Sequence, residues 1–302
     1  MRDAVARAIT EAARGRSDVI LVVADISPAA ALKTFLDENP TRIVDVGVSE
    51  QAMIGMAAGL AITGLRPFCY TIAPFSLYRP LEQIRVDLAY QDLPVVVVGV
   101  GAGLSYSALG ATHHTAEDVA IASAIPNMTV VAPCDPDETE AAMISSFQLS
   151  GPMYLRIGKS GEPTLTGDAR EPFVLGRIRK IREGQGTAII GYGPVLAMAC
   201  TAAEESENGA AIYSAHTLKP LDLDRVDSIL ADYAHVVVLE EHVEQGGLGM
   251  QIRARAQLSK AATQITTFCL PDEFLHEYGS KDDLLQTVGI TQDTLALAIR
   301  GV

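Results

Sequence analysis

The stretch DVGVSEQAM, residues 45–53, ends one apolar segment and begins a helical pattern rich in Ala and Gly. A turn of this kind, between a strand and the next helix, lies at the sheet edge where open parallel α/β proteins bind their ligands. Glu50 is therefore a candidate functional carboxylate. A structural role fits the same residues, because Ser49 would cap the helix and Glu50 would favour its positive end.

Outward from this stretch, short apolar runs alternate with helical patterns such as 49–63 and 75–90, which predicts a parallel sheet covered by helices. The polar segment GKSGEPTLTGDAREP (158–172) reads as a linker, after which the pattern restarts. We expect two α/β domains with mainly parallel sheets, at residues 1–165 and 172–302. The predicted strands are 19–23, 42–45, 66–70, 95–100, 129–132, 152–156, 187–191, 209–214 and 235–240, and further predicted helices are 194–207 and 247–259.

Composition excludes several classes of function. A net charge of −14 argues against nucleic acid as a partner, because such binding needs clustered Lys and Arg. No apolar run reaches the roughly 18 residues of a membrane span, and no apolar signal segment follows Met1. The four cysteines are scattered without paired spacing, which favours reduced thiols. We expect a cytoplasmic protein.

Two further strings contain residue types used in chemistry. Phe75 and Tyr78 lie in YTIAPFSLYRPLEQIR (70–85), where a strand leads through a loop into a helix. His113 and His114 lie in GATHHTAED (110–118). Adjacent side chains point in different directions, so at most one of the two histidines should face a given cleft. Taken alone, Phe75 is more often a core residue, and a lone histidine pair is more often structural or metal-binding than catalytic.

Together and in this order, the strings resemble the pyrimidine-binding domain of transketolases. The resemblance continues through AEDVAIASAIPNMTVVAPCDPDE (116–138) and YLRIGK (154–159). Beyond the linker, HTLKPLD (216–222) and LEEHVEQGGLGMQI (239–252) resemble the family's C-terminal domain. The resemblance covers nearly the whole chain.

The resemblance implies that thiamine diphosphate is the cofactor. A Glu at the position of Glu50 hydrogen-bonds N1′ of its aminopyrimidine ring and so prepares the cofactor for proton loss at C2. Phe75 matches the aromatic residue that stacks on this ring, with Tyr78 as the alternative. Asp25 matches an Asp near the cofactor and the dimer contact, and Arg79 is expected close to the ring.

The resemblance also implies substrate contacts. His113 matches a histidine that contacts substrate hydroxyls and moves protons, and His114 is included beside it. Lys159 lies where the family usually has a phosphate-binding Arg, although Lys lacks the bidentate fork. Two departures are Gly101, where sugar-phosphate transketolases have a phosphate-binding His, and Leu109, where they have an Asp. They predict a weaker dependence on substrate phosphate.

The family binds Mg²⁺ and the diphosphate through a Gly-Asp-Gly string followed by an Asn, in a separate domain. The nearest string here is Gly167-Asp168-Ala169, in the linker. We therefore expect a partner, an N-terminal subunit that holds Mg²⁺ and the diphosphate, with two copies of each subunit in a heterotetramer.

The sequence thus predicts the C-terminal subunit of a split transketolase, a transferase that moves a two-carbon ketol unit from a ketose to an aldehyde. One alternative is the β subunit of a 2-oxoacid dehydrogenase E1 component, which has the same two domains. A 1-deoxyxylulose-5-phosphate synthase fits less well, because that family has all three domains on one chain. The alternative from another class is a non-catalytic, transketolase-like scaffold, against which Glu50 and His113 count.

Overall fold

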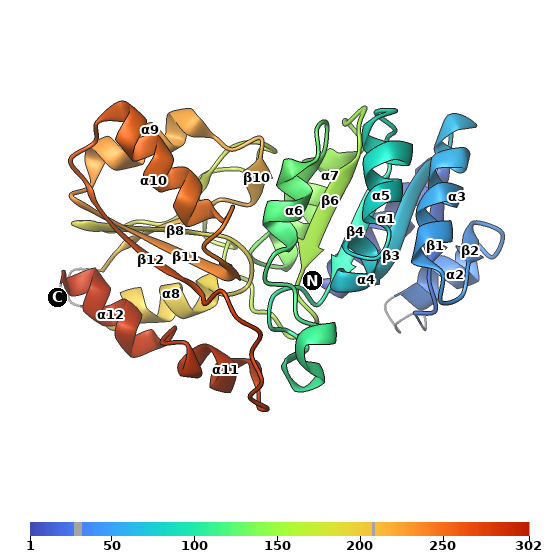
Figure 1. Cartoon of the computed structure of the whole chain (residues 1–302). Coiled ribbons are helices and arrows are strands. Elements are labelled where there is room, and N and C mark those ends of the chain that lie inside the picture. The colour runs from blue at the N-terminus through green and yellow to red at the C-terminus, as the bar shows by residue number, and fades with distance from the viewer. Residues whose placement is uncertain (27–31, 207–208, 302) are drawn as a thin grey trace.

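The computed structural model describes residues 1–26, 32–206 and 209–301, and it contains two β-sheets that lie in neighbouring α/β units (Figure 1). The first sheet has the strand order β10-β5-β6-β4-β3-β1-β2, and its pairs are parallel except for β10 with β5. The second has the order β12-β11-β8-β9-β7, parallel except for β7 with β9. The predicted fold class, two α/β domains with mainly parallel sheets, is confirmed.

Most predicted strands agree with the structure to within one or two residues at each end. The strands of the first sheet are β1 (Val19–Val23), β2 (Ile43–Asp45), β3 (Arg66–Ile72), β4 (Val96–Val100), β5 (Thr129–Val131), β6 (Met153–Ile157) and β10 (Thr217–Lys219). Those of the second are β7 (Arg179–Arg182), β8 (Thr187–Gly191), β9 (Ala211–Ser214), β11 (His235–Val243) and β12 (Gln264–Leu270).

Helices cover both faces of each sheet. In the first unit they are α1 (Arg2–Gly15), α2 (Lys33–Glu38), α3 (Glu50–Ile62), α4 (Ala73–Leu77), α5 (Leu81–Gln83), the π-helix η2 (Ile84–Ala89), the 3₁₀ helix η3 (Ser107–Thr112), α6 (Asp118–Ala124) and α7 (Pro136–Ser146). In the second they are α8 (Leu196–Glu204), α9 (Leu223–Asp232), α10 (Leu248–Ser259), α11 (Lys281–Thr287) and α12 (Gln292–Arg300). Among the described residues, no helix is both long and apolar enough to cross a bilayer.

The predicted continuous helix over 75–90 is wrong. The chain forms α4, a turn and then α5 with η2, and the break falls at Pro80. Proline has no backbone N–H, and its ring clashes with the preceding helical turn, so α4 cannot continue through it. The break leaves Arg79 half-exposed in the turn, which matters for the site described below.

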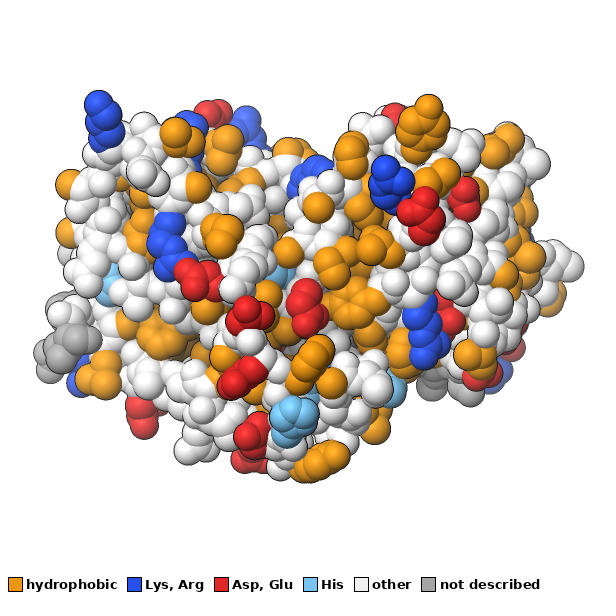
Figure 2. Space-filling view, in the orientation of Figure 1, with side chains coloured by type: hydrophobic (Ala, Val, Ile, Leu, Met, Phe, Trp, Pro, Cys, Tyr) orange, Lys and Arg blue, Asp and Glu red, His pale blue; other side chains and the backbone are white. Residues whose placement is uncertain are grey.

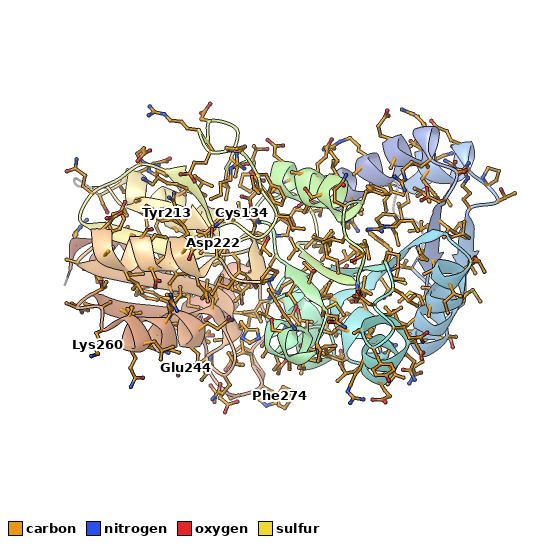
Figure 3. All side chains as sticks on the ribbon, turned by 90° about the horizontal axis from the view of Figure 1, so that it is seen from above. Cys134, Tyr213, Asp222, Glu244, Lys260 and Phe274 are labelled. Atoms are coloured by element: carbon orange, nitrogen blue, oxygen red, sulfur yellow. The ribbon has the colours of Figure 1, made fainter. Side chains whose placement is uncertain are left out.

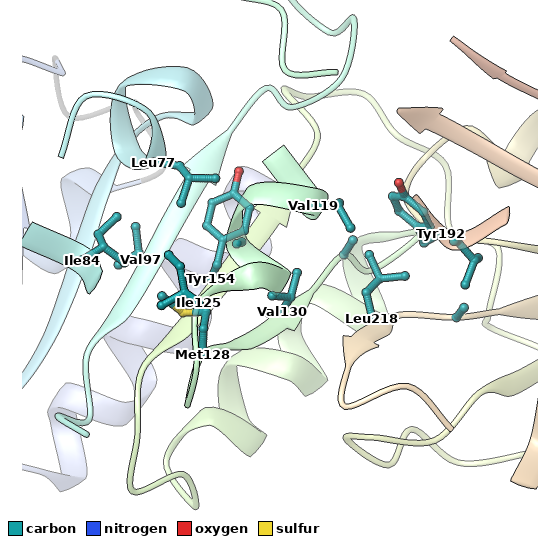
Figure 4. Close-up of a cluster of buried hydrophobic side chains, with 14 of the residues drawn as sticks. Leu77, Ile84, Val97, Val119, Ile125, Met128, Val130, Tyr154, Tyr192 and Leu218 are labelled. Atoms are coloured by element: carbon teal, nitrogen blue, oxygen red, sulfur yellow. The ribbon is translucent and has the colours of Figure 1, made fainter. Parts of the chain in front are cut away.

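Alternate residues of the central strands enter different cores, as the strand pleat requires. Leu21 and Val23 pack with α1 and α7 on one face of the first sheet, whereas Val22 packs with α3 on the other. This second core continues past the linker into the second unit. Figure 4 shows it extending from Leu77 and Val97 to Leu218 and Tyr192.

Strand β10 was not predicted, and it joins the two units. It follows the linker in sequence but pairs with β5 at the edge of the first sheet. A buried ion pair of Arg156 with Asp118 lies nearby, and the Arg156 guanidinium also donates 2.9 Å to the Glu241 carbonyl of β11. The units are therefore connected by backbone pairing and buried polar contacts as well as by the linker. The exact division at 165 and 172 stays a prediction.

Candidate active site

Glu50 begins α3 at the carboxyl edge of the first sheet, and its side chain is buried, with 5% of the residue exposed. The preceding turn is organised by Asp45, whose Oδ1 accepts a hydrogen bond of 2.9 Å from Gly47 N–H. Gly47 has a φ of 67°, a conformation that favours glycine. Ser49 is the N-cap residue of α3, as the structural interpretation predicts, but its side chain makes no capping hydrogen bond.

One oxygen of the Glu50 carboxylate is held by the protein. Arg79 Nη1 donates to Glu50 Oε1 at 2.7 Å. In the part of the chain that the structure describes, no group donates to Oε2. Oε2 therefore keeps its hydrogen-bonding capacity, and Glu50 can accept a hydrogen bond from a bound molecule.

Arg79 also connects Glu50 to an aromatic row. Its guanidinium carbon lies 3.8 Å from the centroid of the Phe75 ring, a cation–π contact. The Phe75 ring meets the edge of the His113 imidazole at a centroid distance of 5.1 Å. The structure thus brings together four residues selected from the sequence: Glu50, Arg79, Phe75 and His113.

His113 reaches this row because its loop folds back on itself. Thr115 closes the loop: its N–H donates to the Gly103 carbonyl at 3.0 Å, and its hydroxyl accepts from Gly103 N–H at 2.6 Å. Burial lowers the pKa of His113, and the charges of Arg79 and His114 lower it further. The imidazole is therefore neutral at pH 7 and able to accept a proton.

Tyr78 and His114 belong to a different cavity of about 300 Å³, together with Glu117 and the segment 270–275 of the second unit. The Tyr78 hydroxyl donates to Glu117 Oε2 at 2.9 Å. His114 Nε2 donates to the Ser107 carbonyl at 3.1 Å. Figure 2 shows acidic and apolar side chains gathered between the two units on the face in view. Phe274, which lines this cavity, is labelled at the edge of the molecule in Figure 3. The two adjacent histidines thus face different surroundings, as expected from the sequence.

Two other residues predicted from the sequence, Asp25 and Lys159, lie apart from the row formed by Glu50, Arg79, Phe75 and His113 (the Glu50 row). Asp25 is exposed after β1, and its backbone N–H donates to Asp45 Oδ1 at 3.3 Å. Lys159 is exposed, and its Nζ lies 4.8 Å from the centroid of the Tyr106 ring.

Tyr106 was not selected from the sequence, although its position beside His113 makes it part of the site. Its ring meets the His113 imidazole edge-on at a centroid distance of 5.8 Å. Aromatic residues in loops are too common to be singled out by pattern. The sequence signal that points to Tyr106 is Gly101. Because glycine has no side chain, it leaves room for the ring of a neighbouring residue, and here that residue is Tyr106.

The residues present fit the aminopyrimidine end of thiamine diphosphate. Glu50 Oε2 can accept a hydrogen bond from a protonated ring nitrogen, and Phe75, which contacts the same Arg79, offers an aromatic ring. The described residues include no group of three or more His, Cys, Asp or Glu side chains able to hold a metal ion.

Comparisons with known proteins agree with this fold. The family model for the transketolase pyrimidine binding domain matches residues 1–162, and the model for the transketolase C-terminal domain matches residues 176–295. The chain therefore belongs to the transketolase family, which uses thiamine diphosphate.

Its similarity to named relatives places it within the family. It is 30% identical over 288 residues to a subunit of the apulose-4-phosphate transketolase of Phocaeicola vulgatus, covering 94% of this chain and 91% of that protein. It is 35% identical over 253 residues to the 6-deoxy-6-sulfo-D-fructose transketolase subunit SqwH of Clostridium sp., covering 82% and 78%. The solved "Split gene transketolase, inactive beta4 tetramer" matches with a TM-score of 0.87 and 28% identity, covering 99% of this chain and 96% of that one. The chain thus corresponds to the β subunit of split transketolases.

Proposed function

We propose that this chain is the C-terminal subunit of a two-component transketolase that transfers a two-carbon ketol unit from a ketose donor to an aldehyde acceptor. The observation that carries the proposal is the buried Glu50 carboxylate, with one oxygen on Arg79 and the other free of donors from the described residues. A scaffold has no need of a largely buried carboxylate that keeps one oxygen open to a bound molecule.

When bound, thiamine diphosphate supplies the electron sink needed to break and form a carbon–carbon bond beside a carbonyl. Glu50 would accept a hydrogen bond from the cofactor's aminopyrimidine, and Phe75 would hold that ring in place. Arg79 keeps the Glu50 carboxylate oriented through Oε1. His113 would contact substrate hydroxyls and accept or return a proton. The cofactor-binding role of Tyr78 is less well supported, because its hydroxyl is engaged by Glu117.

We propose further that activity needs a separate subunit for the diphosphate and Mg²⁺, with two copies of each subunit. Apolar side chains are exposed at Val48, Met56 and Ile62, on or next to α3 and close to Glu50 in sequence. An apolar surface of this kind suits cover by another protein chain. The solved relative is an inactive β4 tetramer of a split transketolase, which supports the proposal that this chain needs a second kind of subunit for activity.

The dehydrogenase β subunit is a weaker proposal, since the similar proteins named above are transketolase subunits. The test is to purify this chain with its partner and screen ketose donors and aldehyde acceptors by mass spectrometry. A product longer than the acceptor by two carbons is expected. Release of CO₂ from a 2-oxoacid, with no such product, would instead support the dehydrogenase.

A further inference from the structure

The string LEEHVEQGGLGMQI (239–252) belongs to the second unit, but the end of β11 within it is bonded to the first unit. The Val243 N–H donates to the Ala116 carbonyl at 2.8 Å. His242 is fully buried, and its Nε2 accepts from the Ala120 N–H at 3.2 Å. Three consecutive residues of β11 therefore become candidates for contact with the site, because the segment that they hold follows directly on the loop of the site histidine.

Glu241, the residue before His242, lies against that loop, which we call the His113 loop (103–115). Backbone bonds between Gly103 and Thr115, together with the Thr115 hydroxyl, close the loop. A Cβ built on Gly103 would lie 3.1 Å from Glu241 Cβ and 3.2 Å from its Oε2, and the φ of this glycine is 65°. The Glu241 side chain thus packs on the point where the loop closes.

A buried guanidinium fixes the backbone at the same point. Arg156 Nη2 donates to the Glu241 carbonyl at 2.9 Å and to the Thr115 carbonyl at 3.3 Å. Arg156 Nε also forms an ion pair with Asp118 at 2.9 Å, in which both side chains are almost completely buried. One donor therefore holds the end of β11 and the end of the His113 loop together, in a place that solvent does not screen.

The Glu241 carboxylate has one donor among the described residues. Lys281, the first residue of α11, donates from Nζ to Oε2 at 2.9 Å, whereas Oε1 is buried without a hydrogen-bond partner in the part of the chain that the structure describes. Glu241 is 1% exposed. Removal of the cation from such a pair leaves a buried charge uncompensated. The side chain would then move toward water, and Gly103 would lose its support.

We propose that Glu241 is a positioning residue for ketol transfer: with Lys281 as its counter-ion, it holds Gly103 at the closure of the His113 loop and so fixes the place of the imidazole. The second unit thus contributes to the reaction without supplying a group that touches the substrate. This inference rests on the proposed function, because it depends on the role of His113 in ketol transfer.

Two kinetic quantities separate positioning from a general loss of structure. Exchange of the cofactor's C2 proton precedes substrate and depends on Glu50, whereas ketol transfer also needs His113. For the complex of this chain with its partner, Glu241→Gln should lower kcat/KM about tenfold, because a displaced proton-transfer group acts poorly. C2 exchange, measured by NMR without substrate, should change less than about twofold.

The pair and the loop are tested by two further variants. Lys281→Met should lower kcat/KM in the same way, and the double variant with Glu241→Gln should lose no more than the larger single loss, because the two residues act as a unit. Thr115→Val removes the hydroxyl that accepts from the Gly103 N–H and leaves β11 intact. It should reproduce the lower kcat/KM with normal C2 exchange, and it tests the loop even where Glu241→Gln does not fold.

Glu240→Gln is the matched control, since Glu240 is the preceding residue of the same strand and is equally buried. Its carboxylate accepts from the Leu248 and Gly249 N–H groups and does not contact the His113 loop. This variant should leave kcat/KM and C2 exchange unchanged.

Amide hydrogen exchange observes the loop on this chain alone. The Thr115 N–H donates to the Gly103 carbonyl, so its exchange, followed by mass spectrometry, should be faster by about threefold or more in Glu241→Gln. Amides of β8, at the centre of the second sheet, should keep their rates.

Equal losses of kcat/KM and C2 exchange in Glu241→Gln, or no loss of either, would overturn the positioning role. An unchanged exchange rate at Thr115 would overturn it as well, and additive losses in the double variant would show that Lys281 acts separately. Failure of the proposed function gives a different result: the unmodified complex transfers no ketol unit from any donor, while exchange at Thr115 is still faster in Glu241→Gln.

Discussion

Two buried glutamates near helix starts, one in each unit, differ in how the protein uses their oxygens. Glu240 is fully buried, and its carboxylate accepts from Leu248 N–H at 2.8 Å, Gly249 N–H at 2.9 Å and the Tyr192 hydroxyl at 3.0 Å. Glu50 has one donor on one oxygen among the described residues. Glu240 thus stabilises the start of α10, whereas Glu50 leaves bonding capacity for another molecule. The number of donors separates the two roles better than burial does.

The largest expected effect concerns the partner. The proposal is that Glu50 Oε2 accepts a hydrogen bond from a cofactor whose diphosphate is bound by another subunit. This chain alone should therefore show no ketol transfer and no measurable binding of thiamine diphosphate. Isothermal titration calorimetry of the isolated chain, followed by titration of the complex, checks this. Micromolar affinity in the isolated chain would contradict the proposed division between subunits.

Glu50→Gln is expected to reduce activity at least about a hundredfold, as for loss of a positioned proton partner. Glutamine keeps the size of the side chain but removes its charge, so the complex should still form. Exchange of the cofactor's C2 proton for deuterium, measured by NMR without substrate, should slow in parallel. Normal turnover and normal exchange would reduce Glu50 to a helix-start residue.

Glu240→Gln should show the reverse pattern. The amide cannot accept all three hydrogen bonds, so the free energy of unfolding should fall by about 2 kcal/mol. The kcat of the folded complex should change little, because Glu240 connects β11 to α10 and Tyr192 rather than to the Glu50 row. Urea unfolding of the isolated chain, combined with the ketol-transfer assay, measures both quantities. A hundredfold loss of kcat without loss of stability would contradict the structural role assigned to Glu240.

A smaller effect is expected from pH at His216, which lies near the boundary between the units. Burial, with the charge of Arg179 as a lesser cause, lowers the pKa of His216 to about 3, and the ring stacks on Phe173 at 4.1 Å. The unfolded chain binds this proton near pH 6.5, so the folded state loses stability as pH falls from 6.5 toward 3. Between pH 7 and pH 5 the loss should be about 2 kcal/mol. Urea unfolding at both pH values measures it.

The control is His216→Gln, which cannot titrate. Its stability should be lower than that of the unmodified chain at pH 7, but should depend less on pH over the same range. Identical slopes for the two proteins would show that His216 does not contribute to the acid sensitivity.

Local sequence determined much of this protein. Apolar runs bounded by turns predict most strands of both sheets, because burial on both faces of a parallel sheet demands such runs. The order of the motifs around Glu50, Phe75 and His113 is enough to indicate the family. The sequence also indicated that His113 and His114 face different surroundings.

Which of these residues come into contact depends on how distant segments pack. Arg79 reaches both Glu50 and Phe75 because the chain breaks at Pro80, and Tyr106 reaches His113 because Thr115 closes its loop on Gly103. Strand β10 pairs with β5, at the edge of the first sheet, and not with the strands of the second sheet that flank it in sequence. Its position therefore depends on a segment that is far away along the chain. Such contacts depend on distances between segments, which no local sequence pattern encodes. That Glu50 Oε2 has no donor among the described residues is likewise visible only from the groups that surround it in the fold.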